Sequence, residues 1–319
     1  MKAVVVYEAG EPEKLVYTDV PTPKIKEGWS LVKVKGFGIN HSEIFTREGK
    51  SPSVIFPRIL GIECVGVIEK TSDPLHLPIG QKVISIMGEM GRAFDGGYAE
   101  FVLLPNAQIY PVTTDLSWEE LVTIPETYYT AYGSLQNLQI KPTDRVLVRG
   151  GTSGVGIAFL KLLKGKDSKI VVEGTTRKLT KRDSLLAAGF DGVVEETEGE
   201  LQTKRTYDKI LELIGPATIK NSFQHINEHG IVCSTGQLGN QWYLENFDPI
   251  FDIKRNSYLT SFYSGNVDGD RLNNLLAYIE ANHIQVFPEK IFKLHEVQLA
   301  HEYLQSQSSF GKVIVMNNK

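Results

Sequence analysis

A glycine-rich turn between a strand and a helix is the feature that most limits what this chain can fold into. In residues 144–163, DRVLVRGGTSGVGIAFLKLL, four glycines separate an apolar strand-like run from an amphipathic helix-like run. Such glycines allow a sharp turn and close packing, and the N-terminus of the helix offers free N–H groups and a positive dipole end to a pyrophosphate. The stretch predicts a dinucleotide-binding fold; the alternative is a structural turn that binds nothing.

The glycine pattern departs from a strict G-x-G-x-x-G motif at one position. Gly151 and Gly156 match, Ser153 stands in place of the middle glycine, and Gly154 partly compensates for it. We expect the phosphate-binding residues to be Gly151, Thr152, Ser153, Gly154, Val155 and Gly156.

From about Ser117 onward, strands alternate with helix-length amphipathic segments. We expect strands at residues 145–149, 169–173, 192–194, 209–214, 231–235 and 258–263. We expect helices between them, at residues 155–163, 181–188 and 217–226. This alternation is typical of βαβ units, so it predicts an α/β class with a doubly wound parallel sheet of the Rossmann type.

The first 115 or so residues have a different texture, with short β-rich runs interrupted by Gly and Pro, which predicts a compact and mostly antiparallel β domain. The tail resumes that texture, with a helix near residues 270–282 and a closing strand at 312–316. We therefore predict a β-rich domain over 1–122, a dinucleotide-binding domain over 123–264, and a return to the first domain over 265–319.

The end of the second expected strand, in KIVVEGTTRK, indicates which dinucleotide the chain would take. NAD sites place a carboxylate there for the ribose hydroxyls, whereas NADP sites place cations and hydroxyls for the 2′-phosphate. Thr175, Thr176 and Arg177 stand at that end, and we expect Glu173 to point away from it. Because a guanidinium suits phosphate, we predict NADPH; the alternative is that Arg177 merely begins a solvated helix.

Composition excludes several classes of partner. Acidic residues outnumber basic ones, 38 against 34, so no overall positive field favours nucleic acid or an anionic membrane. No window approaches the ~18 apolar residues of a spanning helix, and no signal-like run opens the chain. Cys64 and Cys233 are the only cysteines, which we expect to be buried thiols rather than a disulfide. We expect a cytoplasmic protein.

Several segments together resemble the medium-chain dehydrogenase/reductase superfamily, and within it the zinc-free quinone oxidoreductase-like branch. They are PRILGIECVGVI (57–68), DGGYAEFVLLP (95–105), PETYYTAYGSL (125–135), RGGTSGVG (149–156), YDKILELIG (207–215) and FGKVIV (310–315). The resemblance implies a GroES-like β domain joined to a Rossmann domain, hydride transfer from a nicotinamide, and a homodimer or homotetramer.

The resemblance also allows the zinc question to be weighed. Laid over the alcohol dehydrogenase pattern, the three catalytic ligand positions fall on Asn40, Ile62 and Glu126. Catalytic zinc needs three good ligands from Cys, His, Asp or Glu, and these residues offer one. The segment 88–97, GEMGRAFDGG, has none of the cysteines of a structural zinc lobe. We therefore expect no zinc at either site and no other metal.

Candidate catalytic residues follow from the same comparison. Ser42, beside His41, occupies a position that hydrogen-bonds substrate or relays protons in zinc enzymes; the alternative is an ordinary turn residue. Asn40 and Tyr128 are further candidates, although a tyrosine there is more often part of the core. A carboxylate pair of Glu63 and Glu126 is also conceivable, with a structural role for Glu63 as the alternative.

On the nicotinamide side, the resemblance implies contacts from residues on three elements. These are Thr130, the strand end Ile214–Gly215 and the strand end Thr235–Gly236.

Together these features predict a zinc-independent, NADPH-dependent reductase of quinones or α,β-unsaturated carbonyl compounds, acting on a small electrophilic molecule. Without metal, the developing charge on the substrate oxygen meets only hydrogen-bond donors, and a conjugated acceptor spreads that charge. Two alternatives stay open: a metal-dependent alcohol dehydrogenase, and an NADPH-binding sensor without catalysis. The acidic balance disfavours the RNA binding known for some relatives.

Overall fold

A computed structural model describes residues 1–306 and 308–317 of the chain, which form two compact units. The first unit comprises Met1–Thr127, Gly265–Leu276 and Val286–Lys319. The second comprises Tyr128–Ser264 and Ala277–Gln285. The predicted class, a GroES-like β-rich domain with a Rossmann-type parallel sheet, is confirmed.

The first unit contains two sheets. The smaller has the order β2 (Leu15–Asp19), β1 (Lys2–Val6), β4 (Arg58–Ile59). The larger has the order β16 (Lys290–Lys293), β17 (Val313–Met316), β3 (Trp29–Ile39), β5 (Glu63–Lys70), β6 (Lys82–Ile86), β8 (Tyr110–Pro111), with β7 (Phe101–Pro105) also on β3. Its helices are α1 (His41–Arg47), α2 (Trp118–Thr123) and α9 (Val297–Gln305), with short 3-10 turns at Pro12–Lys14, Asn106–Gln108 and Leu294–Glu296.

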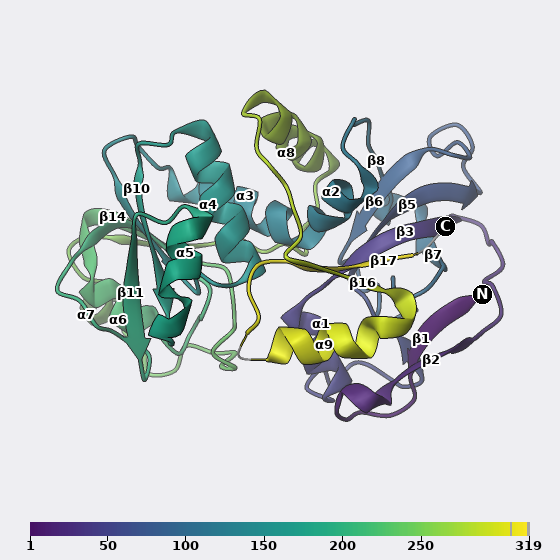
Figure 1. Cartoon of the computed structure of the whole chain (residues 1–319), viewed down its shortest axis with the longest axis horizontal. Helices are drawn as coiled ribbons and strands as arrows, with labels where there is room; N and C mark the ends of the chain where they lie inside the picture. The colour runs from purple at the N-terminus through teal and green to yellow at the C-terminus, as the bar shows by residue number, and fades with distance from the viewer. Residues whose placement is uncertain (307, 318–319) are drawn as a thin grey trace. The chain divides into compact units, whose positions relative to one another are not determined.

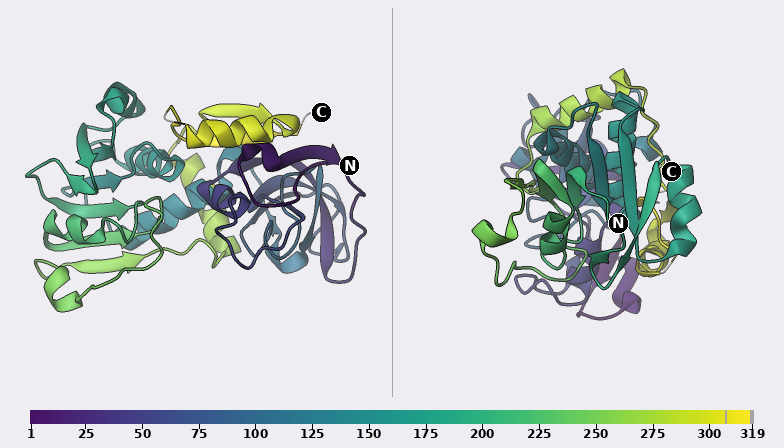
Figure 2. Two further views of the ribbon diagram at one scale, coloured as in Figure 1. Left: turned by 90° about the horizontal axis from the view of Figure 1, so that it is seen from below. Right: turned by 90° about the vertical axis from the view of Figure 1, so that its left-hand side faces the viewer.

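The tail of the chain completes this unit. Strand β17 pairs antiparallel with β3, with Val313 opposite Ile39 and Met316 opposite Gly36. Figures 1 and 2 show α9 and β17, in yellow, beside the purple N-terminal strands. The closing strand predicted at 312–316 is thus present. The register also places Lys312 next to Asn40, which matters below.

A buried polar network joins α1 to α9. The Arg47 guanidinium is fully buried and donates to the carbonyl of Gly10 (2.9 Å) and to Gln305 Oε1 (3.1 Å), and it lies 3.2 Å from His301 Nδ1. The Tyr98 hydroxyl lies 3.0 Å from the other ring nitrogen of His301. Burial and the nearby Arg47 together lower the pKa of His301 to about 3, so the ring is neutral and structural.

The second unit is built around one seven-stranded sheet. Its order is β12 (Glu200–Leu201), β11 (Gly192–Thr197), β10 (Val171–Thr176), β9 (Arg145–Arg149), β13 (Tyr207–Glu212), β14 (Ile226–Ser234), β15 (Tyr258–Ser261). The helices are α4 (Gly154–Lys166), α5 (Arg182–Ala188), α6 (Ile219–Gln224) and α7 (Pro249–Asp252), with a 3-10 turn at Leu179–Lys181. Two helices, α3 (Pro125–Leu138) and α8 (Gly269–Ala281), run across the boundary of the units.

The strand order explains why helices cover both faces of this sheet. All pairs are parallel except β11 with β12. The chain moves outward from β9 in one direction through α4 and α5, and in the other through α6. Because crossovers are right-handed, these two sets of helices lie on opposite faces (Figure 2). The order reverses between β9 and β13, where ligands of such sheets usually bind.

Several element boundaries differ from the sequence expectation; the strand expected at 169–173, for example, is β10 at Val171–Thr176. Two further differences concern β14 and β12. The helix expected at 217–226 ends at Gln224, because Ile226 already pairs with Tyr207 as the first residue of β14. The sheet also has a short extra strand, β12, which turns back on β11 after Gly199 in the left-handed region (φ 81°). A two-residue strand after a glycine carries too little periodicity to be predicted.

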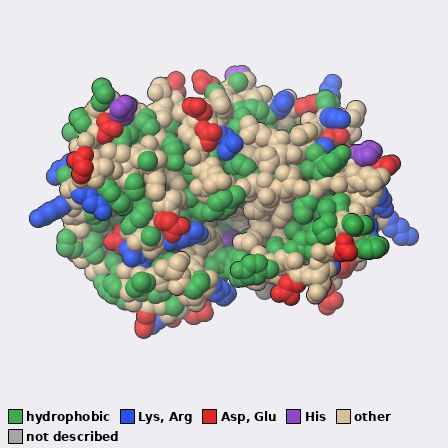
Figure 3. All heavy atoms as spheres, turned by 180° about the vertical axis from the view of Figure 1, so that it is seen from behind, with side chains coloured by type: hydrophobic (Ala, Val, Ile, Leu, Met, Phe, Trp, Pro, Cys, Tyr) green, Lys and Arg blue, Asp and Glu red, His purple; other side chains and the backbone are tan. Residues whose placement is uncertain are grey.

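Each unit has its own apolar core, and each unit contains one cysteine. Cys64 and Cys233 are buried free thiols, as expected. None of the helices in the described part of the chain has the length and apolar character needed to cross a bilayer. Lys, Arg, Asp and Glu side chains are interspersed on the face shown in Figure 3, without a large patch of one sign.

Candidate functional site

The predicted strand–turn–helix is present in the second unit. Strand β9 ends at Arg149 and α4 begins at Gly154, after a turn whose Ser153 is the N-cap. The Ser153 hydroxyl accepts from the N–H of Gly156 at 3.1 Å, so this serine caps the helix. A Cβ atom on Gly156 would lie 2.6 Å from the carbonyl oxygen of Gly150, so only glycine fits there. The turn therefore has the close backbone packing that a pyrophosphate-binding loop needs.

The end of β10 lies next to this turn. Thr175 accepts from the N–H of Gly150 at 3.0 Å and so ties β10 to the glycine turn. The Thr176 hydroxyl accepts from the N–H of Lys178 at 3.1 Å and orders the segment that follows. Arg177 is exposed and makes no ion pair with any described residue. Burial lowers the pKa of Lys181, and the cations Lys178 and Arg177 lower it further, which shows that these positive charges gather beyond β10.

Glu173, the one carboxylate on β10, is directed elsewhere, as expected. Its side chain is 5% exposed and forms a salt bridge with Arg205, and Arg145 lies 4.0 Å away. A carboxylate engaged in this way does not offer its oxygens to a ribose at the end of β10.

The predicted residues at the ends of β13 and β14 come together. Glu212 Oε1 accepts from the N–H groups of Ile214 (2.9 Å) and Gly215 (3.1 Å). The backbone N–H of Thr235 donates to the carbonyl of Glu212 at 2.9 Å. A Cβ atom on Gly215 would lie 2.4 Å from the carbonyl oxygen of Gly236, so the two loops touch through glycine.

Helix α3 brings Thr130 to the same region. The Ser134 hydroxyl donates to the carbonyl oxygen of Thr130 at 2.8 Å and lies 3.0 Å from the Thr235 hydroxyl. Thr130, Thr235 and the Ile214–Gly215 loop are thus held in one hydrogen-bonded group within the second unit.

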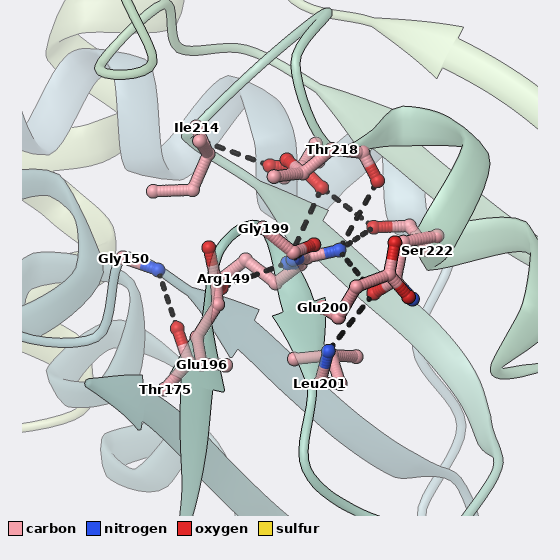
Figure 4. A network of polar contacts seen from close by, with 12 residues as sticks. Arg149, Gly150, Thr175, Glu196, Gly199, Glu200, Leu201, Ile214, Thr218 and Ser222 are labelled. Atoms are coloured by element: carbon pink, nitrogen blue, oxygen red, sulfur yellow. Dashed lines mark hydrogen bonds and ion pairs between the residues drawn. The ribbon is translucent and has the colours of Figure 1, made fainter. Parts of the chain in front are cut away.

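A buried arginine that sequence reasoning missed supports these loops. Arg149, the last residue of β9, is fully buried, and its Nε donates to Glu196 (3.1 Å) and lies 3.6 Å from Glu212 Oε2. Figure 4 shows its guanidinium reaching further oxygens on several elements. These are the carbonyls of Thr218 (3.1 Å) and Gly199 (2.8 Å), Asn221 Oδ1 (3.0 Å) and Ser222 Oγ (3.0 Å). Arg149 thus orients Glu212, which in turn holds the Ile214–Gly215 loop.

Replacing Arg149 with Met should therefore damage both stability and the loop. Two buried carboxylates would lose their cation, and removing one partner of such a group costs roughly 3–5 kcal/mol. Arg149→Lys should lose less stability than Arg149→Met, because lysine keeps the positive charge but lacks the planar set of N–H donors of a guanidinium. Arg145→Met is a matched control on the same strand. Arg145 is 44% exposed, and its ion pair with Glu173 is long, at 4.0 Å. Urea unfolding of the three variants measures the effect; equal losses for Arg149→Met and Arg145→Met would contradict it.

In the first unit, a buried ion pair lies where the resemblance places the zinc ligands of alcohol dehydrogenases, a position at which no metal is expected. Lys312 Nζ donates to Glu63 Oε1 at 2.6 Å and to Asn40 Oδ1 at 2.7 Å. Asn40 Nδ2 donates to Glu63 Oε1 at 2.9 Å, and Glu63 Oε2 accepts from the backbone N–H of Glu126 at 2.6 Å. Both charged side chains are almost fully buried, 5% exposed for Lys312 and 0% for Glu63. A Cβ atom on Gly38 would lie 2.0 Å from Glu63 Oε1, so the glycine makes room for the pair.

These contacts decide between the two readings of Glu63. The backbone N–H of Glu126, and not its carboxylate, donates the hydrogen bond to Glu63. The structural role is the one observed, with Lys312 as the cation that holds Glu63. The role of Lys312 was not predicted, because a lysine just before an apolar closing strand is typical of an exposed strand end.

The residues at this position do not fit a catalytic zinc. Ile62 has no ligand atom, and the Asn40 oxygen already accepts from an ammonium group that would repel a divalent cation. Across residues 1–306 and 308–317, no group of three His, Cys, Asp or Glu side chains is arranged to hold a metal ion.

The remaining catalytic candidates lie in different settings. Ser42, in the first turn of α1, accepts a hydrogen bond from Arg92 Nη2 at 2.7 Å. The rings of His41 and Phe45 lie 6.5 Å apart. Tyr128 is 2% exposed, and burial raises the pKa of its phenol well above the usual value. Its neighbour Tyr129 is fully buried against Phe262, as a core residue.

Glu43 is a second residue that the sequence did not reveal. Its side chain is 1% exposed, and its Oε1 accepts weakly from Asn40 Nδ2 and from the N–H of Ile62, both at 3.3 Å. Its Oε2 has no hydrogen-bond partner among the described residues. Burial, together with the nearby Glu63, raises the pKa of Glu43 to about 8, against the opposing effect of Lys312. Glu43 is therefore a protonated acid at neutral pH.

This shift predicts a pH dependence of stability with a definite sign. Between the ordinary pKa of a glutamic acid and about 8, the folded chain keeps a proton that the unfolded chain has released. Raising the pH through that window should lower the free energy of unfolding by up to about 1.4 kcal/mol per pH unit relative to Glu43→Gln, which cannot titrate. Urea unfolding of both proteins between pH 5 and 8.5 checks this. Parallel stability curves would show that Glu43 is already ionised.

Comparison with known proteins agrees with this fold. The alcohol dehydrogenase GroES-like domain matches residues 26–114, and the zinc-binding dehydrogenase family matches residues 188–315. A zinc-type alcohol dehydrogenase-like protein of Schizosaccharomyces pombe is 24% identical over 320 residues, 92% of each chain. The quinone oxidoreductase of Homo sapiens is 28% identical over 250 residues, 75% of this chain and 74% of its own.

Among solved structures, a mycobacterial protein complexed with NADPH superposes with a TM-score of 0.83 at 23% identity, over 99% of both chains. These similarities extend over both units and agree with the GroES-like domain of the first unit. The chain is therefore an oxidoreductase of the medium-chain dehydrogenase/reductase superfamily, similar to quinone oxidoreductases and to zinc-type alcohol dehydrogenase-like proteins.

Proposed function

We propose that this chain is an NADPH-dependent reductase that works without zinc and transfers hydride to a quinone or an α,β-unsaturated carbonyl compound. The observation that carries the proposal is the buried contact of Lys312 with Asn40 and Glu63. At the position where a metal-dependent relative places its first ligand, this chain places an amide that is already bound to an ammonium group.

The second unit supports the choice of cofactor. The glycine turn from Gly150 to Gly156 and the N-terminus of α4 would hold the pyrophosphate. Arg177, exposed at the end of β10, would hold the 2′-phosphate, with Thr176 ordering the segment that follows. Glu173 is engaged with Arg205, so no β10 carboxylate opposes that phosphate. When bound, the dinucleotide supplies the hydride.

The Thr130, Ile214–Gly215 and Thr235–Gly236 group would position the nicotinamide end. This group is hydrogen-bonded through Ser134 and Glu212 and anchored by Arg149, so its backbone groups are held in place before any ligand arrives. Such preorganisation lowers the cost of orienting two reactants.

The donors in the first unit support the choice of acceptor. Negative charge develops on the substrate oxygen as hydride is delivered, and each hydrogen-bond donor stabilises it by roughly 3–4 kcal/mol in a dry site. Ser42 is the candidate donor, whereas Asn40 already donates to Glu43 and Glu63, and Tyr128 is buried and resists ionisation. A quinone or a conjugated enone spreads the charge over several atoms, so a few donors suffice. A simple alkoxide concentrates the charge on one oxygen, for which a metal is the usual solution.

The direct test is NADPH oxidation with 1,4-benzoquinone, 3-penten-2-one and butanal, each with and without 1,10-phenanthroline. We expect turnover of the quinone and the enone, little turnover of the aldehyde, and no effect of the chelator. Elemental analysis of the protein should find zinc well below one atom per chain. Aldehyde or alcohol turnover that the chelator abolishes would establish a metal-dependent dehydrogenase. NADPH binding without oxidation by any acceptor would establish a sensor.

The cofactor assignment predicts a selective effect at Arg177. Arg177→Gln should raise the KM for NADPH about tenfold, the value of one lost charge-assisted hydrogen bond, and leave the KM for NADH unchanged. Arg182→Gln is the matched control, since Arg182 is also exposed and belongs to the next helix. Steady-state kinetics with both cofactors check this. Equal changes in the KM values for NADPH and NADH would show that Arg177 does not bind the 2′-phosphate. A preference of the wild type for NADH would contradict the assignment of NADPH as cofactor.

A further inference from the structure

Arg92 lies on a tightly built loop of the first unit, between β6 and β7. The N–H of Arg92 donates to the carbonyl of Glu89 at 3.0 Å, and the N–H of Gly91 donates to that of Phe94 at 2.9 Å. Gly91 and Gly96 both pack on Gly61: a Cβ atom on either would lie within 2.8 Å of a Gly61 backbone atom. The loop therefore holds Arg92 in a preorganised position.

Arg92 forms no ion pair with any residue that the structure describes. Its Nη2 donates to Ser42 Oγ at 2.7 Å, and its Nε is buried without a hydrogen-bond acceptor among the described residues. No carboxylate within the described part of the chain lies within 4.0 Å of the guanidinium. Asp95, an acid of the same loop, accepts instead from Arg58 Nη1 (2.9 Å) and from the N–H of Ile59 (3.1 Å).

This arrangement differs from that of the other embedded cations. Lys312 has Glu63 and Arg149 has Glu196 and Glu212, because a charge removed from water is costly unless it is paired. Arg92 is half-buried and has only a neutral hydroxyl. Its remaining N–H donors are suited to an anion, and carboxylate is the group whose planar shape a guanidinium matches best.

Ser42 links this cation to the candidate catalytic residues. It lies two residues after Asn40, at the start of α1. Because its oxygen accepts from Arg92, its own hydroxyl proton is left for another acceptor. Guanidinium and hydroxyl together thus provide donors for one anionic group.

We propose that Arg92, supported by Ser42, binds a carboxylate of the substrate, so that the acceptor is an acidic enone or quinone rather than a neutral one. The inference rests on the proposed function for the reducible bond, but the carboxylate site itself does not depend on turnover. A permanent anion offsets the charge of Arg92 in the resting complex, which an oxyanion formed only during the reaction would not do.

Binding tests the site without any reaction. Calorimetric titration of the full chain, alone and with NADP, would compare levulinate (4-oxopentanoate) with its methyl ester. We expect levulinate to bind at least tenfold more tightly than the ester. Arg92→Met should weaken levulinate binding by about 10–100-fold and leave ester binding unchanged, as expected for hydrogen bonds to a charged group. Arg92→Lys should retain part of the preference, and Ser42→Ala should lose a smaller part of it.

Arg58→Met is the matched control, because it removes a cation whose partner, Asp95, belongs to the same loop. It should keep the preference for levulinate. Equal binding of acid and ester by the wild type, or an unchanged preference in Arg92→Met, would overturn the proposal. Loss of the preference in Arg58→Met as well as in Arg92→Met would also overturn it, since the loop alone would then be responsible.

Turnover provides the second arm, with 4-oxopent-2-enoate and its methyl ester as acceptors. Arg92→Met should lower kcat/KM for the acid about 10–100-fold and leave the ester unaffected. An equal loss for acid and ester would place Arg92 at the reacting oxygen or in the fold, against a carboxylate site. If no acceptor oxidises NADPH, the proposed reductase function fails, while the levulinate titration still decides the carboxylate site.

Discussion

The buried ion pair of Lys312 with Glu63 is the interaction on which the first unit depends. A buried pair is tolerable only when every remaining donor and acceptor is satisfied, and here Asn40 and the N–H of Glu126 complete the set. The pair joins β17, from the end of the chain, to β3, β5 and the start of α3. It therefore ties the end of the chain into the unit and engages the oxygens of Asn40 and Glu63 in hydrogen bonds.

The second unit follows the same rule with a different cation. Arg149 lies at the end of β9, and its carboxylates come from β11 and β13, so one guanidinium ties together the strands on both sides of the switch point. Glu212 passes this order on to the Ile214–Gly215 loop. In both units, then, buried charge serves to hold backbone groups at the strand ends in place. Against this background the half-buried guanidinium of Arg92, whose hydrogen-bond partner among the described residues is Ser42, supports the proposed carboxylate site.

Much of the fold could be predicted because its signals are local. The glycine turn, the alternation of strands and helices and the return of the tail are all visible in short windows, and the structure contains them. The polar clusters could not be predicted, because they join residues far apart in sequence, such as Asn40 with Lys312 or Arg149 with Asn221. Arg149 and Lys312 stand at the ends of apolar runs, where charged residues are usually exposed, and a single sequence does not show that these cations are buried. Glu43 likewise reads as one more acid in the first turn of a helix.

The two kinds of polar group in the first unit would contribute to different parts of a reaction. A carboxylate bound to Arg92 carries the same charge before, during and after hydride transfer. Its contact therefore stabilises ground state and transition state alike, and should appear chiefly in KM. The donors near Asn40 and Ser42 meet an oxygen whose charge grows only in the transition state, so their effect should appear in kcat. Ser42 belongs to both groups of polar residues, because its oxygen accepts a hydrogen bond from Arg92 while its proton can be donated to the substrate. In a site whose first ligand position holds Asn40 bound to Lys312, substrate affinity and charge stabilisation would thus be divided between two neighbouring groups, which a metal ion would combine.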